Sequence, residues 1–151
     1  MRFRFSLQKV LEQRKIEKDI AEREFQTASQ AARTQSEKIK SFYQQIDEAR
    51  AKSSSLVKTG GALSPDLNQI ETFIQRQKIK IERENMLLRQ LKSDEEARRE
   101  SLIEAAREFK IFEKLKEKKS EEFRKEQIRK DHRITDEIVV TRAWRSKNHG
   151  S

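Results

Sequence analysis

The residue types that most often catalyse reactions or bind metals are sparse in this chain. It has two histidines, His132 and His149, and no cysteine, so thiolate chemistry and disulfides are excluded. Both histidines lie among charged residues without an acidic pair at metal-ligand spacing. Carboxylates such as Glu95 and Glu96 suit the charged surface of a helix, and no glycine-rich phosphate loop occurs. The sequence therefore predicts no enzyme, no catalytic residue, no cofactor, no metal site and no small-molecule substrate.

Basic side chains at the two ends of the chain are the more promising functional groups. The net charge is +9. Residues 1–18 carry six Lys/Arg against two acidic residues, and residues 110–147 carry thirteen against eight. Residues 19–109 have sixteen of each and are neutral. All of the excess positive charge thus belongs to the termini, where it can steer association with an acidic protein surface.

The composition does not suit a compact globular domain. Apolar residues make up 33% of the chain and charged residues 40%, whereas globular domains have about 45–50% and about 25%. No apolar run is long enough to span a membrane, and the basic start lacks the apolar core of a secretory signal. These features and the absence of cysteine lead us to expect a cytoplasmic protein.

The apolar residues are strongly periodic, which argues against disorder. They recur in alternating steps of four and three residues from Leu7 to Leu56, and again from Leu67 to Phe123. A repeat of 3.5 residues sustained over this length is typical of a left-handed coiled coil.

The stretch "LVKTGGALSPDL" separates these two seams and contains the only proline. Gly60 and Gly61 can adopt the positive φ values that end a helix. Ser64 is a favourable N-cap, Pro65 suits the first helical position, and Asp66 complements the helix dipole. A connection this short favours antiparallel neighbours.

We therefore predict an all-α fold in which two long helices form an antiparallel coiled-coil hairpin. Residues 1–151 form a single coiled-coil domain. Its expected parts are a first helix at about 5–57, a turn at 58–64, a second helix at about 65–143 and a disordered tail at 144–151.

One register of the hairpin is favoured over its neighbours. With Leu56 opposite Leu67, no layer of the seam is polar on both sides, whereas a slip of one heptad would face Lys18 with Arg98. Burying unpaired cations is costly. In the favoured register Leu7 faces Lys116, so the second helix overhangs the first by roughly 25 residues, or about 40 Å.

Apolar residues outside the seams indicate contacts with other proteins. Val139, Val140 and Trp144 lie where the hairpin offers no partner helix, and such exposure suggests protein recognition. Tyr43 and Phe73 lie beside the seam, where they either pack at its edge or form part of a docking surface. Nucleic-acid binding by the basic end is disfavoured, because its cations alternate with acids and no groove-reading motif accompanies them.

Several segments resemble the flagellar export protein FliJ family. These are "FRFSLQKVLEQRKIEKDIAERE" at the start, "FIQRQKIKIE" after the turn, "FEKLKEKKSEEF" at 112–123, and "ITDEIVVTRAW" near the end. The resemblance covers nearly the whole chain.

This resemblance implies a cytoplasmic, non-enzymatic component of the flagellar type III export apparatus. Members of the family form an antiparallel coiled coil similar to the γ stalk of rotary ATPases. They are understood to insert their paired termini into the hexameric ring of the export ATPase FliI. The resemblance also implies contact with the export gate protein FlhA at the inner membrane, and binding of export chaperones.

The basic, protruding end agrees with insertion into an ATPase ring and supplies one set of candidate contacts. This set comprises Arg14, Lys118, Lys119, Arg124, Lys125, Arg129, Lys130, Arg133, Ile138, Arg142 and Trp144. The end near the turn is left for the gate, with Tyr43, Ile46 and Phe73 as candidates. Alternative functions are a generic coiled-coil export chaperone or adaptor, an injectisome stalk homologue, and, less favoured, a nucleic-acid-binding coiled coil.

Overall fold

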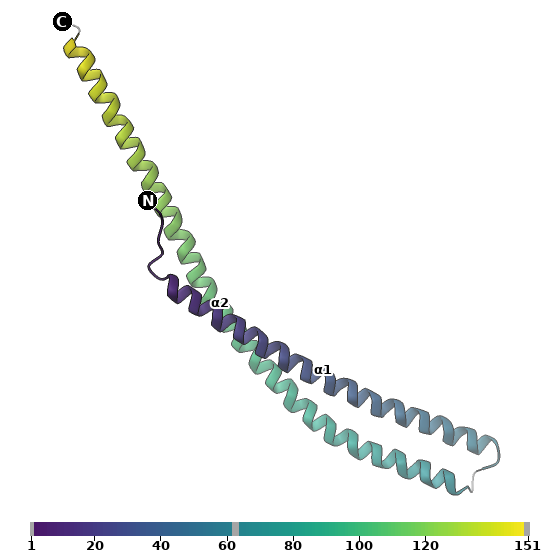
Figure 1. Ribbon diagram of the computed structural model, residues 1–151. Helices are drawn as coiled ribbons and strands as arrows, with labels where there is room; N and C mark the ends of the chain where they lie inside the picture. The colour runs from purple at the N-terminus through teal and green to yellow at the C-terminus, as the bar shows by residue number, and fades with distance from the viewer. Residues whose placement is uncertain (1, 62–63, 150–151) are drawn as a thin grey trace. The chain divides into compact units, whose positions relative to one another are not determined.

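Two long helices make up almost all of the computed structural model, which describes residues 2–61 and 64–149 (Figure 1). Helix α1 spans Gln8–Lys58 and has 51 residues, and α2 spans Pro65–His149 and has 85 residues. No strand occurs among the described residues. The predicted all-α hairpin with a longer second helix is confirmed.

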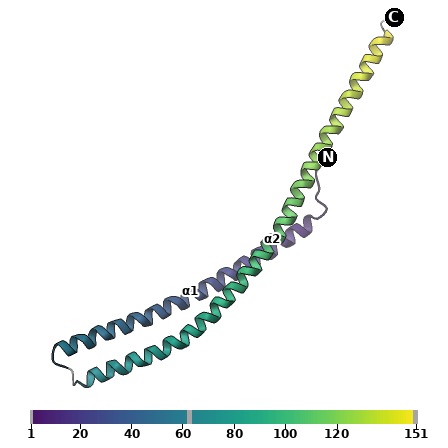
Figure 2. The ribbon, with the colours of Figure 1, turned by 180° about the vertical axis from the view of Figure 1, so that it is seen from behind.

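The chain divides into two compact units, and both helices contribute to each. The hairpin unit comprises residues 19–104, and the terminal unit comprises residues 1–18 together with residues 105–151. In the hairpin unit the two helices lie side by side in opposite directions and are joined at the turn (Figures 1 and 2).

The core of the hairpin unit lies on the seam predicted from the 3.5-residue repeat. Its cluster consists of Ile39, Ile46, Ala49, Ile74 and Ile81, with Phe42, Ile70 and Leu88 packed against it. Further from the turn, α1 buries the small residues Ala21, Ala28 and Ala32 instead. Burial of apolar side chains along one face of each helix is therefore the main stabilising contribution here.

Polar contacts between the helices agree with the predicted register. Gln77 Nε2 donates a hydrogen bond to Gln45 Oε1 at 2.5 Å, and Arg98 Nη1 lies 3.0 Å from Glu24 Oε2. Each pair joins residues at or beside facing seam positions when Leu56 lies opposite Leu67. A slip of one heptad would move these partners about 10 Å apart along the helices.

A second polar layer joins the helices at Gln35, which is buried on the seam. Its Nε2 donates to the backbone oxygen of Glu84 at 3.0 Å and to the Glu84 carboxylate, which also lies 3.2 Å from Lys38 Nζ. These hydrogen bonds, first from Gln35 and then from Lys38, lower the pKa of Glu84 below its ordinary value. A buried polar side chain with its partners in place favours one register.

The end of α1 has the geometry of a Schellman motif. Gly60 has a φ of 85°, and its N–H donates to Val57 O at 3.2 Å. The Gly61 N–H donates to Leu56 O at 2.7 Å. On the other side of the turn, Ser64 Oγ accepts a hydrogen bond from Asp66 N at 3.2 Å. The helix-ending role is confirmed for Gly60 and the N-capping role for Ser64, whereas Gly61 does not have the positive φ that was also expected for it.

Gly60→Ala should lower the free energy of unfolding by about 1 kcal/mol, because an L side chain is strained at positive φ. No atom lies within 4 Å of the position that a Cβ would occupy, so conformational strain is the expected cause. Urea unfolding followed by circular dichroism measures the effect. The control Ser54→Ala, at an exposed position of α1, should change stability by less than about 0.5 kcal/mol. Equal stability of the two variants would contradict this prediction.

The helix bounds differ from the expected ones at both termini of the chain. Helix α1 begins at Gln8 rather than near residue 5, because the preceding residues run non-helically along α2. Helix α2 continues to His149, so residues 144–149 are helical where a disordered tail was expected. No glycine or proline interrupts this segment before Gly150. Residues 62–63 of the predicted turn and 150–151 of the predicted tail lie outside the described residues.

Candidate partner-binding surfaces

Within the terminal unit, cations on the α1 seam lie over phenylalanine rings of α2. The guanidinium carbon of Arg14 lies 5.9 Å from the centre of the Phe112 ring, and Lys18 Nζ lies 5.1 Å from the Phe109 ring. Arg14 Nη1 also lies 2.9 Å from Glu108 Oε2 and 3.0 Å from Glu17 Oε2. Arg14, a candidate for ring binding, therefore serves in the packing between the helices.

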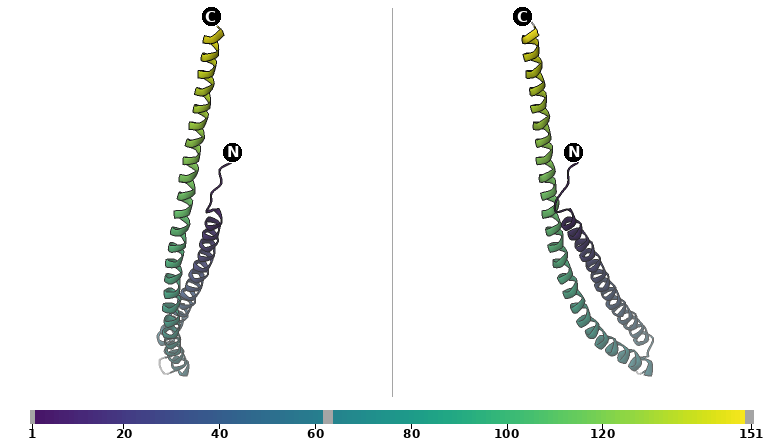
Figure 3. Two further views of the ribbon diagram at one scale, coloured as in Figure 1. Left: turned by 90° about the vertical axis from the view of Figure 1, so that its left-hand side faces the viewer. Right: turned by 60° about the vertical axis from the view of Figure 1, so that its left-hand side comes forward.

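Beyond these contacts, α2 continues as an overhang, which we define as residues 127–149. Figure 3 shows this part of α2 extending beyond the start of α1 without a companion helix. Every residue from 128 to 149 is exposed. The overhang contains six Lys/Arg and three acidic residues, so it is positively charged.

Large apolar side chains are exposed on more than one side of the overhang. Ile134 and Ile138, four residues apart, share one face, with 55% and 46% of their surfaces exposed. Val140 and Trp144 share another face, about 120° away around the helix, with 67% and 65% exposed. An isolated helix in water gains no stability from apolar side chains that are exposed on several of its faces. This distribution is typical of a helix that a partner encloses.

The other basic candidates on α2 all have exposed side chains. Some pair with acids on their own helix. Arg124 Nη2 lies 2.6 Å from Glu121 Oε1, which raises the pKa of Arg124 and lowers that of Glu121. Looser pairs join Lys119 to Glu122 and Arg129 to Glu126, at 3.6 and 3.8 Å. Among the described residues, no ion pair engages Lys118, Lys125, Lys130, Arg133 or Arg142. These five side chains are therefore available for contacts with another protein.

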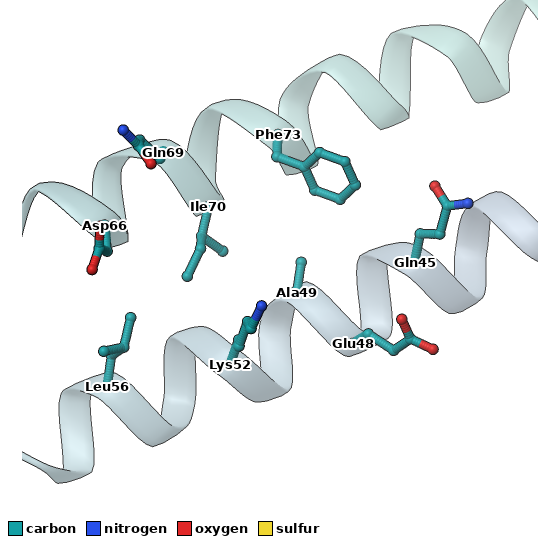
Figure 4. A pocket seen from close by; sticks show the side chains of 9 residues that line it. All are labelled: Gln45, Glu48, Ala49, Lys52, Leu56, Asp66, Gln69, Ile70 and Phe73. Carbon is teal, nitrogen blue, oxygen red and sulfur yellow. The ribbon is translucent and has the colours of Figure 1, made fainter.

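A groove lies between the helices of the hairpin unit near the turn (Figure 4). Ile70 and Phe73 of α2 face Ala49 and Leu56 of α1 across it (Figure 4). Its other lining residues are polar or charged: Gln45, Glu48, Lys52, Asp66 and Gln69. Because 41% of Phe73 remains exposed, this ring can take part in a contact with another protein.

The two remaining gate candidates differ in accessibility. Tyr43 is 51% exposed and is available for binding. Ile46 is only 3% exposed and belongs to the hydrophobic cluster. The expectation that Ile46 contacts a partner is therefore corrected: its side chain is occupied by packing against α2.

The described residues contain no group of three or more His, Cys, Asp or Glu side chains placed to hold a metal ion. His132 and His149 are both exposed on the overhang. Within the same part of the chain, no helix has the length and apolar character needed to cross a membrane.

The sequence predictions included no individual residue of the N-terminal arm, which we define as residues 2–6. Phe3 and Phe5 of the arm are half-buried, and the Phe3 and Phe123 ring centres are 5.6 Å apart. The alternation of apolar Phe3, Phe5 and Leu7 with polar residues is a signal of an extended, one-sided segment. The sequence of the arm, however, does not show which residues its apolar side covers. That depends on which part of α2 lies beside it.

In a comparison with known protein families, the chain matches the model of the flagellar FliJ protein, which aligns with residues 3–148. Comparisons with curated proteins and with solved structures give no significant match. The aligned region includes the arm except Arg2, all of α1, the turn, and α2 except His149.

Proposed function

The chain belongs to the FliJ family, whose members have a role in flagellar protein export, and from this premise we propose that it is a non-enzymatic coupling stalk. Its overhang binds inside the hexameric ring of the export ATPase FliI and regulates ATP hydrolysis. The observation that carries this proposal is the exposure of apolar side chains on several faces of a positively charged, unaccompanied helix. A ring that surrounds the helix would bury all of these faces at once.

The positive charge of the overhang also favours binding to a surrounding protein surface that carries acidic groups. The cations of the overhang that lack ion pairs in the described structure can steer its entry and orient it without losing existing contacts.

The hairpin unit offers a second contact, with the export gate protein FlhA. The groove near the turn combines an apolar floor with the half-exposed Phe73, and Tyr43 is exposed nearby in sequence on α1. This arrangement would link the ATPase to the gate from a position in the cytoplasm. Export chaperones are proposed as further partners of the same protein.

Neutralising overhang cations should weaken stimulation of the ATPase. In the variant Lys130→Gln, Arg133→Gln, Arg142→Gln, the stalk concentration that gives half-maximal stimulation should rise about tenfold, with a weaker dependence on salt. The measurement is phosphate release by purified FliI across a titration of the stalk.

A matched variant controls for the loss of net charge. Arg76→Gln, Lys78→Gln, Arg83→Gln removes three exposed cations from the hairpin unit and should leave stimulation unchanged. Equal effects of the two triple variants would contradict a specific role of the overhang. Export cargo binding by the chain without any effect on the ATPase would favour a chaperone or adaptor instead.

A further inference from the structure

The N-terminal arm lies against α2 in the terminal unit, and a groove lies between the two. Phe3, Arg4 and Phe5 line this groove with Glu122, Phe123 and Glu126 of α2. The Phe3 ring packs at 48° against the Phe123 ring, with the centres 5.6 Å apart. The arm therefore covers Phe123, the last phenylalanine of the α2 seam.

Side-chain burial, rather than main-chain pairing, holds the arm in place. Among the described residues no backbone hydrogen bond joins the arm to α2, and Phe5 O instead accepts from Gln8 N at 3.1 Å. Phe3 and Phe5 are half-buried, while Arg2 and Arg4 are exposed. A segment with so few buried contacts and no ladder of hydrogen bonds opens at low cost.

Phe123 lies on the same side of α2 as two exposed apolar residues of the overhang. Ile134 follows Phe123 by about three helical turns and Ile138 follows by one more, so the three side chains lie near one face of α2. Ile134 and Ile138 are 55% and 46% exposed. The arm thus covers a phenylalanine on the same side of α2 as these exposed residues of the overhang.

We propose that the arm is a displaceable cover that regulates how far the export ATPase ring engages α2. When the arm is docked, the ring has access only to the overhang. When the arm leaves, Phe123 becomes accessible on the same side of α2 as Ile134 and Ile138, and binding tightens. This inference rests on the proposed function, since it concerns regulation of the same binding surface.

The absence of cysteine allows the arm to be locked chemically. Arg4→Cys combined with Glu122→Cys places one thiol on the arm and one on α2, both in the lining of the same groove. A short bismaleimide then joins the two, and N-ethylmaleimide modifies the same thiols without joining them. Purified FliI is the binding probe, and cross-linking within one chain is verified by mass.

The locked form should bind FliI about tenfold more weakly than the form modified by N-ethylmaleimide, because it cannot bury Phe123 against the ring. Adding Phe123→Ala should abolish the difference between the two forms. Circular dichroism should give the same helicity for both, since the arm is not helical.

Equal binding of the locked and open forms would overturn the inference while leaving the proposed function intact. Tighter binding of the locked form would also overturn it, because the docked arm would then be part of the binding surface. Failure of every form, including the unmodified chain, to bind FliI would overturn the proposed function itself and this regulation with it.

Discussion

Removal of residues 127–151 is expected to abolish stimulation of the export ATPase and to leave the rest of the protein folded. The removed residues from 128 to 149 are all exposed in the structure. The truncated chain keeps Phe123, its contact with Phe3 and the whole hairpin unit. Phosphate release by FliI should therefore return to the rate of the ATPase alone, because the apolar faces that the ring would bury are missing.

A full-length variant tests whether stimulation depends on the apolar side chains of the overhang or only on its length. Replacement of Ile134, Ile138, Val140 and Trp144 by alanine preserves the helix and its charges, since alanine is the best helix former. This variant should lose most of the stimulation, by at least about tenfold. Thermal unfolding of both proteins should resemble that of the intact chain. Normal stimulation by the truncated protein would refute the assignment of the overhang as the ring-binding element.

Ile46→Ala should have the largest effect on stability, lowering the free energy of unfolding by about 2–5 kcal/mol. Ile46 is 3% exposed and belongs to the cluster that contains Ile74 and Ile81. The substitution removes apolar surface and leaves a cavity between helices that have few other large buried side chains. Urea unfolding followed at 222 nm measures the loss.

Tyr43→Ala is the matched control, because Tyr43 lies three residues away on α1 and is 51% exposed. Its effect on stability should stay below about 1 kcal/mol. If Tyr43 belongs to the gate-binding surface, the same variant should weaken FlhA binding without unfolding the protein. A similar loss of stability in the two variants would show that the cluster around Ile46 is not the main core of the hairpin unit.

Layers of the seam that pair an apolar side chain of one helix with a polar or charged side chain of the other explain how a chain with 40% charged residues maintains a helical pair. Arg99 lies 5.5 Å from the Phe25 ring, and Arg14 and Lys18 make similar contacts with Phe112 and Phe109. A cation over an aromatic ring keeps its charged end near water while its methylene groups cover apolar surface. In the observed register these cations are therefore partly solvated and lie over aromatic rings. In a shifted register, cations would instead be buried against each other.

Local features of the sequence determined the elements of this protein and their order. The 3.5-residue repeat placed both helices, and Gly60, Ser64 and Pro65 located the turn, because these signals act between neighbouring residues. The same repeat predicted the register, since pairing Leu56 with Leu67 avoids layers that are polar on both sides. The basic end was likewise evident from the distribution of charge.

Only the tertiary structure decided how individual side chains are used. It placed Ile46 in the core rather than on a binding surface, set Arg14 against Phe112 and Glu108, and docked Phe3 on Phe123. It also continued α2 through residues 144–149. Contacts between residues a hundred positions apart depend on the rotation and spacing of the packed helices, and the periodicity of either helix alone does not contain that information.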